Sequence, residues 1–148
     1  MKKSFKGFTL IELLVVIGII AILSTIVIIA INPARQFAQS RNTQRSANVL
    51  AILNAVGQNM ADNSGVFTCA AGVIPTTPTT MEDTNGYNVA PCLVPTYIPS
   101  LPFDPQIGNY TSTSSYNTGY KISRDVSTNR ITVVASSTEL GVTISLTR

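Results

Sequence analysis

Residues 7–16 of the chain read GFTLIELLVV, and this stretch decides what the rest of the sequence can form. A single carboxylate, Glu12, lies near the start of a long apolar run, and no charged residue follows between Leu13 and Ile31. Nineteen helical residues extend roughly 28 Å, which is about the thickness of the hydrocarbon core of a bilayer. An ionised side chain in hydrocarbon costs several kcal/mol, so Glu12 is expected to have a partner and a function.

The basic residues at the N-terminus have an order that differs from a secretory signal. Lys2, Lys3 and Lys6 come first, then the small residue Gly7, and only then the apolar run. An ordinary signal peptide places its small-residue cleavage site after the apolar region. Cleavage at Gly7 would therefore leave the hydrophobic helix on the mature protein. The lysines also predict a cytoplasmic N-terminus and an exported remainder, by the positive-inside rule.

These residues closely resemble the N-terminal motif of type IV prepilins and of the pseudopilins of type II secretion. That motif is a short basic leader ending in glycine, followed by phenylalanine and, four residues later, by glutamate; here these are Gly7, Phe8 and Glu12. The resemblance implies that a prepilin peptidase cleaves between Gly7 and Phe8 and then N-methylates Phe8. The new amine would lie about one helical turn from Glu12. We expect Glu12 to pair with that amine, in its own chain or in a neighbouring copy, and so to set axial register during assembly.

Composition argues against several classes of function. The formal net charge of +3 belongs to the leader lysines, because the chain without residues 1–7 has seven basic and seven acidic side chains. The basic pI is therefore no argument for nucleic-acid binding, and no direct nucleic-acid ligand is expected. The chain has no histidine, which removes the commonest general base and transition-metal ligand. With no phosphate-binding or dinucleotide motif either, we predict no catalytic residues and no enzymatic activity.

The predicted fold class is α+β, a long N-terminal helix whose second half packs on a small antiparallel sheet; the lollipop shape is implied by the resemblance. We divide the chain into a leader peptide (1–7), a transmembrane and assembly helix (8–33), an amphipathic helix half (34–63), a Thr/Pro/Ser-rich loop region (64–118) and an antiparallel β-sheet (119–148). Pro33 either starts a separate helix or kinks a continuous one. In the amphipathic half one apolar stripe is expected to pack in the core: Val49, Ile52, Leu53, Val56 and Met60.

Three arginines precede this stripe, at positions 35, 41 and 45. They are interpreted as a solvated face or a headgroup contact in the monomer, with inter-subunit ion pairing as the alternative. At the other end of the chain, Tyr120–Arg124 and Arg130–Val133 alternate apolar and polar residues and predict a β-hairpin, and Leu140–Leu146 predicts a third strand.

The loop region contains a candidate disulfide and a candidate calcium site. Cys69 and Cys92 are the only cysteines, both on the exported side, and we predict that they form a disulfide that pins the loop. The stretch Leu101–Pro105 resembles a loop of major pseudopilins that leads into a calcium-binding region, which makes Asp104 a weak calcium candidate. Few carboxylates follow Asp104, and Ca²⁺ prefers several, so no cofactor is expected and a rigid loop is the favoured reading.

These observations predict a structural protein. We expect a type IV pilin that starts as a single-pass precursor in the bacterial inner membrane and is polymerised, by a membrane-embedded assembly machine, into a helical homo-oligomeric filament on the cell surface. Such a filament would serve adhesion, motility or DNA uptake. The alternatives are a type II secretion pseudopilin and a single-pass anchored binding domain that does not polymerise.

Overall fold

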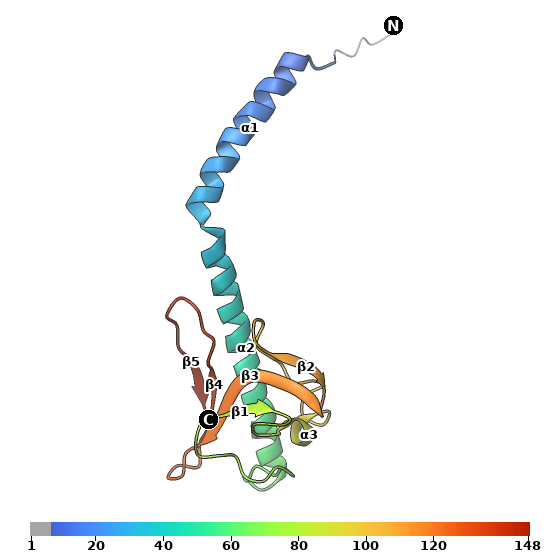
Figure 1. Cartoon of the computed structure of the whole chain (residues 1–148), viewed down its shortest axis with the longest axis vertical. Helices are drawn as coiled ribbons and strands as arrows, with labels where there is room; N and C mark the ends of the chain where they lie inside the picture. Colours follow the sequence, from blue (N-terminus) through green and yellow to red (C-terminus); the bar gives the residue numbers. More distant parts are fainter. Residues whose placement is uncertain (1–6) are drawn as a thin grey trace. The chain divides into compact units, whose positions relative to one another are not determined.

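The computed structural model describes residues 7–148, so the leader lysines and most of the predicted leader 1–7 lie outside the described residues (Figure 1). The chain divides into two compact units, Met1–Phe37 and Ala38–Arg148. The first unit contains a long apolar helix and the second contains a small antiparallel sheet packed on a helix. The predicted α+β fold class is confirmed.

The long helical region is two helices, α1 (Leu10–Ile31) and α2 (Pro33–Asp62). Asn32 separates them because its backbone is left-handed, with φ 48° and ψ 79°. The Asn32 carbonyl oxygen accepts hydrogen bonds from the amides of Arg35 and Gln36, and its side-chain oxygen accepts one from Arg35. Asparagine tolerates this conformation better than most residues, and proline suits a first helical position. Of the two readings of Pro33, the structure therefore shows the separate helix.

The predicted apolar stripe of α2 packs in the core of the second unit. Val49, Ile52, Leu53 and Val56 are buried, and Met60 is partly buried against them. The buried side of α2 extends further in both directions than the apolar pattern indicates. It continues through Ala38, Asn42, Arg45 and Asn59, at helical spacings of three and four. The polar members of this row are the residues that hold the surrounding loops.

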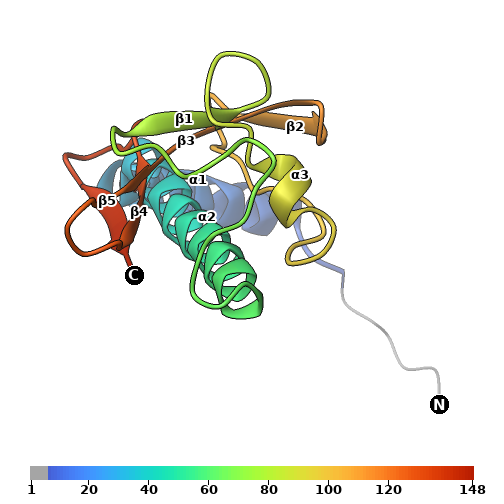
Figure 2. The same cartoon turned by 90° about the horizontal axis from the view of Figure 1, so that it is seen from below.

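Five strands form one antiparallel sheet, and α2 lies across one of its faces (Figure 2). The strand order is β1-β3-β4-β5, and β2 also pairs with β3, the longest strand. Along β4, alternate residues from Ile131 to Ala135 are buried. The strands are β1 (Thr79–Glu82), β2 (Asn109–Ser112), β3 (Ser115–Arg124), β4 (Ile131–Ala135) and β5 (Ile144–Thr147).

The sheet confirms the predicted hairpin and differs from the prediction elsewhere. Tyr120–Arg124 pairs with Ile131–Ala135, and the turn between them is closed by Asp125, whose carboxylate accepts hydrogen bonds from the amides of Ser127 and Thr128. The third strand starts at Ile144 instead of Leu140. Two short strands, β1 and β2, and a single helical turn, α3 (Ala90–Leu93), lie in the region predicted to be loop.

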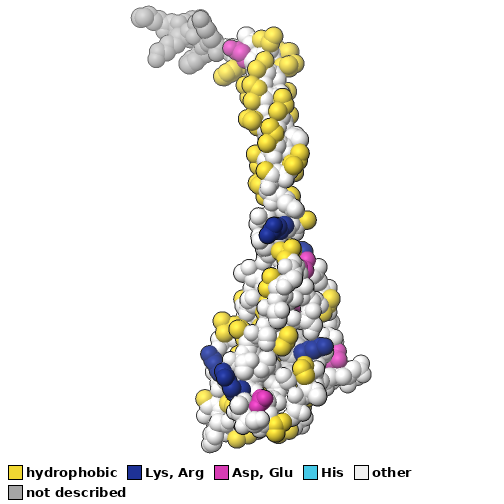
Figure 3. Space-filling model, turned by 90° about the vertical axis from the view of Figure 1, so that its left-hand side faces the viewer, with side chains coloured by type: hydrophobic (Ala, Val, Ile, Leu, Met, Phe, Trp, Pro, Cys, Tyr) yellow, Lys and Arg dark blue, Asp and Glu magenta, His cyan; other side chains and the backbone are white. Residues whose placement is uncertain are grey.

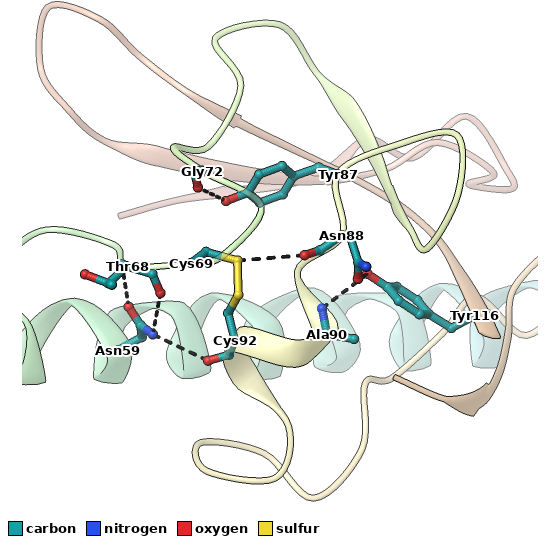
Figure 4. Close-up of a disulfide and its surroundings, with 9 residues drawn as sticks. All are labelled: Asn59, Thr68, Cys69, Gly72, Tyr87, Asn88, Ala90, Cys92 and Tyr116. Carbon is teal, nitrogen blue, oxygen red and sulfur yellow. Dashed lines mark hydrogen bonds between the residues drawn. A yellow bond between two sulfur atoms is a disulfide. The ribbon is translucent and has the colours of Figure 1, made fainter. Parts of the chain in front are cut away.

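The predicted disulfide between Cys69 and Cys92 is present and sits beside the distal part of α2 (Figure 4). Asn59 of α2 is buried next to it. Its side-chain amide donates to the carbonyl oxygens of Thr68 and Cys92, and its oxygen accepts from the Thr68 amide at 2.9 Å. The disulfide and Asn59 therefore fix the start of the long loop against the helix together.

Removing this cross-link is expected to destabilise the second unit. Replacing both cysteines, Cys69→Ser with Cys92→Ser, should lower the free energy of unfolding by about 3 kcal/mol, because the unfolded chain regains the freedom of the closed loop. Denaturant unfolding of the oxidised wild type and the double variant measures the difference. Equal unfolding midpoints would show that Asn59 and the core hold the loop without the cross-link.

Candidate functional site

The two residues of the predicted cleavage site precede the first helix. Gly7 and Phe8 are exposed and lie outside any helix or strand, and α1 begins two residues later, at Leu10. A protease binds its substrate in an extended form, so a cleavage site must lie outside the helix or be unwound. The position of Gly7 and Phe8 meets that requirement without unfolding of α1. The Phe8 side chain is 84% exposed.

Glu12 closes a capping box at the start of α1. One of its carboxylate oxygens accepts hydrogen bonds from the backbone amide of Thr9 at 2.8 Å and from the Thr9 hydroxyl at 2.7 Å. The Thr9 hydroxyl oxygen in turn accepts from the Glu12 amide. This arrangement satisfies backbone donors that a helix start leaves unpaired, and it places a negative charge at the positive end of the helix dipole. In the uncleaved chain, then, Glu12 is bonded to Thr9. Its predicted partner, the amine of Phe8, arises only on cleavage.

Helix α1 is apolar on every side. None of its side chains is buried in the structure, and the space-filling view shows hydrophobic side chains along its whole length (Figure 3). By length and composition it can cross a membrane. A helix that is hydrophobic all round is stable only in a bilayer or inside a bundle. Glu12 is its single charged residue.

A buried cluster of charges lies in the second unit, around Arg45. The Arg45 guanidinium is fully buried and contacts two carboxylates, Asp104 at 2.7 Å and Glu139 at 2.9 Å. Gln106 and Asn42 accept its remaining hydrogen bonds. Arg41 forms a second, two-pronged pair with Glu139. The interpretation as a solvated face is therefore wrong for Arg45, whose side chain is fully buried, whereas Arg41 stays partly exposed and pairs with a carboxylate of its own chain.

Asp104 is held inside this cluster and not at the surface. Its side chain is fully buried, and its oxygens accept hydrogen bonds from Arg45 and from the backbone amides of Gln106 and Ile107. Burial alone would raise the pKa of Asp104, but these donors outweigh it and lower the pKa. Over residues 7–148 no group of three or more His, Cys, Asp or Glu side chains is placed to hold a metal ion. The Asp104 calcium site stays a prediction, and what the structure shows at this position is an anchor for the 101–108 loop.

Glu139 is bonded through every polar group it has. Its carboxylate accepts from Arg41 and Arg45, its carbonyl oxygen accepts from the Asn42 side-chain amide, and its amide donates to the Asn42 side-chain oxygen. The guanidinium groups of Arg41 and then Arg45 lower the pKa of Glu139 from 4.5 to about 2. Three residues within about one turn of α2, Arg41, Asn42 and Arg45, thus fix one residue of the β4–β5 loop, nearly a hundred residues away.

The lowered pKa of Glu139 predicts acid sensitivity. A carboxylate whose pKa is lower in the folded protein than in the unfolded chain adds stability above its unfolded pKa, and this stability is lost as pH falls through the folded value. The contribution of Glu139 should therefore be complete above pH 4.5 and should disappear toward about pH 2. Denaturant midpoints across this window should fall less in Glu139→Gln than in the wild type. Parallel curves for the two proteins would contradict the assignment.

Sequence reasoning proposed one of these two sites. Gly7, Phe8 and Glu12 follow from a local motif, and their roles stay predictions. The cluster around Arg45 was missed, because its members are spread over residues 41–139 and arginines on a helix usually face solvent. The available signal was the helical spacing of Asn42 and Arg45 from Val49, which places them on the buried stripe.

Comparison with known proteins gives one result, at the N-terminus. No match is found among curated proteins or among solved structures. A family model does match residues 2–28, and it describes the prokaryotic N-terminal methylation motif. The chain therefore carries, ahead of and within α1, the prepilin-type cleavage and methylation motif of type IV pilins and pseudopilins.

Proposed function

We propose that this chain is the structural subunit of a type IV pilus. In this proposal a prepilin peptidase cleaves after Gly7 and methylates the amine of Phe8, and the product leaves the inner membrane as a helical filament of identical copies. The filament reaches the cell surface and serves adhesion, motility or DNA uptake. The chain acts as a building block, with no catalytic residue and no required cofactor.

The observation that carries the proposal is the complete exposure of α1. Twenty-two residues form a helix without one buried side chain, and the matched processing motif extends into this helix. In the precursor a bilayer covers these side chains. Once the helix leaves the bilayer, the α1 helices of other copies can cover its apolar side chains. Glu12, alone among apolar neighbours, then needs a cation, and the cleaved N-terminus of a neighbouring copy provides one.

A second candidate, a type II secretion pseudopilin, is favoured by the stretch Leu101–Pro105. In this loop Asp104 accepts hydrogen bonds from the Arg45 guanidinium and from two backbone amides. Because the protein supplies its own cation there, the 101–108 loop has an anchor that needs no bound ion. This arrangement supports the pilus over the pseudopilus, since the likeness to major pseudopilins rests on this loop.

N-terminal mass spectrometry on material sheared from cells at native expression tests the proposal. A chain that begins at N-methylated Phe8 in the sheared fraction would support processing and surface assembly together. Processed chain that stays in the cell envelope, with protein secretion lost when the chain is deleted, would support the pseudopilin instead. Full-length chain from Met1, confined to the membrane, would overturn both and leave an anchored binding domain.

A further inference from the structure

Two adjoining apolar cavities lie where the C-terminal part of α2 meets the sheet. The larger has a volume of about 180 Å³ and the smaller of about 40 Å³, and Met60 and Ile131 line both. We call the two cavities together the Met60 crevice. A cavity of about 150 Å³ is enough for one benzene ring, so the larger cavity can take a single ring or a short hydrocarbon chain. Its lining residues are Leu53, Val56, Gly57, Met60, Ile131 and Arg148.

The register of the sheet places one arginine beside each cavity. Arg124 of β3 lies opposite Ile131 of β4, and Ile131 exchanges two backbone hydrogen bonds with Arg148, at 2.8 and 2.9 Å. Residues directly opposite one another in an antiparallel sheet project from the same face, so the two arginines flank Ile131 on its own face. Arg148 lines the larger cavity and Arg124 lines the smaller one.

Neither of these guanidinium groups has a carboxylate partner among residues 7–148, where the ion pairs involve Arg41 and Arg45. Arg124 donates to the side-chain oxygen of Asn129 at 2.8 Å, and Arg148 donates to that of Asn54 at 2.9 Å. The Nε of Arg124 is buried and has no hydrogen-bond partner. A buried donor without an acceptor is costly, and a charged donor bonds most strongly to an anion. Both arginines therefore keep donors that an anionic group can use.

Gly57 leaves space in the larger cavity that its backbone does not require. It lies inside α2, where glycine weakens a helix relative to alanine. A Cβ at this position would lie 3.5 Å from Nη1 and 3.8 Å from Cδ of Arg148, which are ordinary contact distances. Its φ is also outside the left-handed range. A larger side chain at position 57 is therefore compatible with the helix and would fill the space beside Arg148.

We propose that the Met60 crevice binds a small amphipathic carboxylate. The ring or short hydrocarbon chain of the ligand occupies the larger cavity, and its carboxylate faces Arg124 and Arg148. These two arginines are separated by two strand spacings, about 10 Å between backbones, which is within the combined reach of two arginine side chains. An apolar cavity with a few polar groups at its edge is the usual form of a small-molecule site. The binding does not depend on assembly, so it goes beyond the proposed filament subunit.

Nuclear magnetic resonance of isotope-labelled methionine methyl groups tests the site in the full chain, held in lipid nanodiscs. The sequence has three methionines, at positions 1, 60 and 81. Met60 lines both cavities, whereas Met81 is fully buried and lines neither, so it serves as an internal reference. Hydrocinnamate, a single ring with a carboxylate, should shift the Met60 signal saturably and leave Met81 unchanged. Hydrocinnamyl alcohol, the matched uncharged probe, should bind at least about tenfold more weakly, because it lacks the charged acceptor.

Variants of the crevice separate its two parts. Arg124→Gln and Arg148→Gln should each weaken hydrocinnamate about tenfold and leave the alcohol unchanged. Arg130→Gln is the matched control, because Arg130 is exposed and lines neither cavity. Gly57→Leu should abolish the Met60 response to both probes by filling the larger cavity. An unchanged Met81 signal and an intact Cys69–Cys92 disulfide report that each variant is folded.

Three results would overturn the proposal. The first is the lack of a saturable Met60 shift in the wild type, or an equal shift of Met81. The second is equal affinity for the acid and the alcohol, and the third is full hydrocinnamate binding in both arginine variants. Because the chain is measured in a bilayer, these results are distinct from the test of the filament, which depends on the sheared fraction.

Discussion

Arg45→Met should lower the free energy of unfolding of the second unit by about 3–5 kcal/mol, because it leaves a buried carboxylate without its cation. Asp104 is fully buried and Glu139 partly so, and both lose their shared partner. The two loops that carry these carboxylates lose their anchor on α2 at the same time. For a domain of this size the whole free energy of unfolding is about 5–15 kcal/mol, so the expected loss is a large share of it.

Denaturant unfolding of the full chain in detergent, followed by the near-ultraviolet dichroism of the buried tyrosines, measures this loss. Arg130→Met is the matched control, because Arg130 is exposed; its effect should stay within about 0.5 kcal/mol. The pair Arg45→Met with Asp104→Leu should be less destabilised than Arg45→Met alone, since no fully buried charge then remains. A pair as unstable as the single variant would show that the loss comes from packing and not from the unpaired carboxylate.

Loss of the charge at Glu12 is expected to abolish the filament while membrane insertion is retained. Glu12→Ala removes both the capping box with Thr9 and the negative charge, whereas Glu12→Gln keeps an oxygen that can accept from the Thr9 amide. If the charge pairs with the Phe8 amine of a neighbouring copy, both variants should be absent from the sheared fraction. Both should remain in the membrane fraction, because neither change makes α1 less apolar.

Comparing the two variants separates the roles of Glu12. Filament from Glu12→Gln, but none from Glu12→Ala, would indicate that the cap at the helix start matters and the charge does not. Normal filament from both would contradict the assembly role and favour an anchored domain. Immunoblots of membrane and sheared fractions, with mass spectrometry of the N-terminus, provide the measurement.

The helices and the hairpin could be predicted because their patterns are local. The uncharged run from Leu13 to Ile31 and the stripe from Val49 to Val56 each repeat over several turns. Strands β1 and β2 could not be predicted in this way, since each has four residues, most of them polar, and pairs with the longer strand β3. The start of β5 was misjudged for another reason. Leu140 fits an alternating pattern, but the bonds of Glu139 to α2 hold it in a turn.

The two candidate sites also differ in whether their sequence patterns are local. The predicted cleavage and methylation residues are adjacent in sequence, so a ten-residue motif suffices to predict them. The partners of Arg45 are 59 and 94 residues away, and nothing local distinguishes Asp104 or Glu139 from other carboxylates. An arginine at a core position of a helix implies that a carboxylate from a distant part of the chain packs against it. Burial of its charge requires such a partner, and only the tertiary fold supplies it.

The left-handed residue between α1 and α2 has a mechanical consequence. A continuous helix transmits fraying along its ladder of hydrogen bonds, but here the ladder stops at Asn32, and Pro33 has no amide hydrogen to continue it. The two helices are therefore separate cooperative units for amide hydrogen exchange. We therefore expect local melting of α1 to end at residue 32. The second unit is expected to keep its fold if α1 moves from one environment to another.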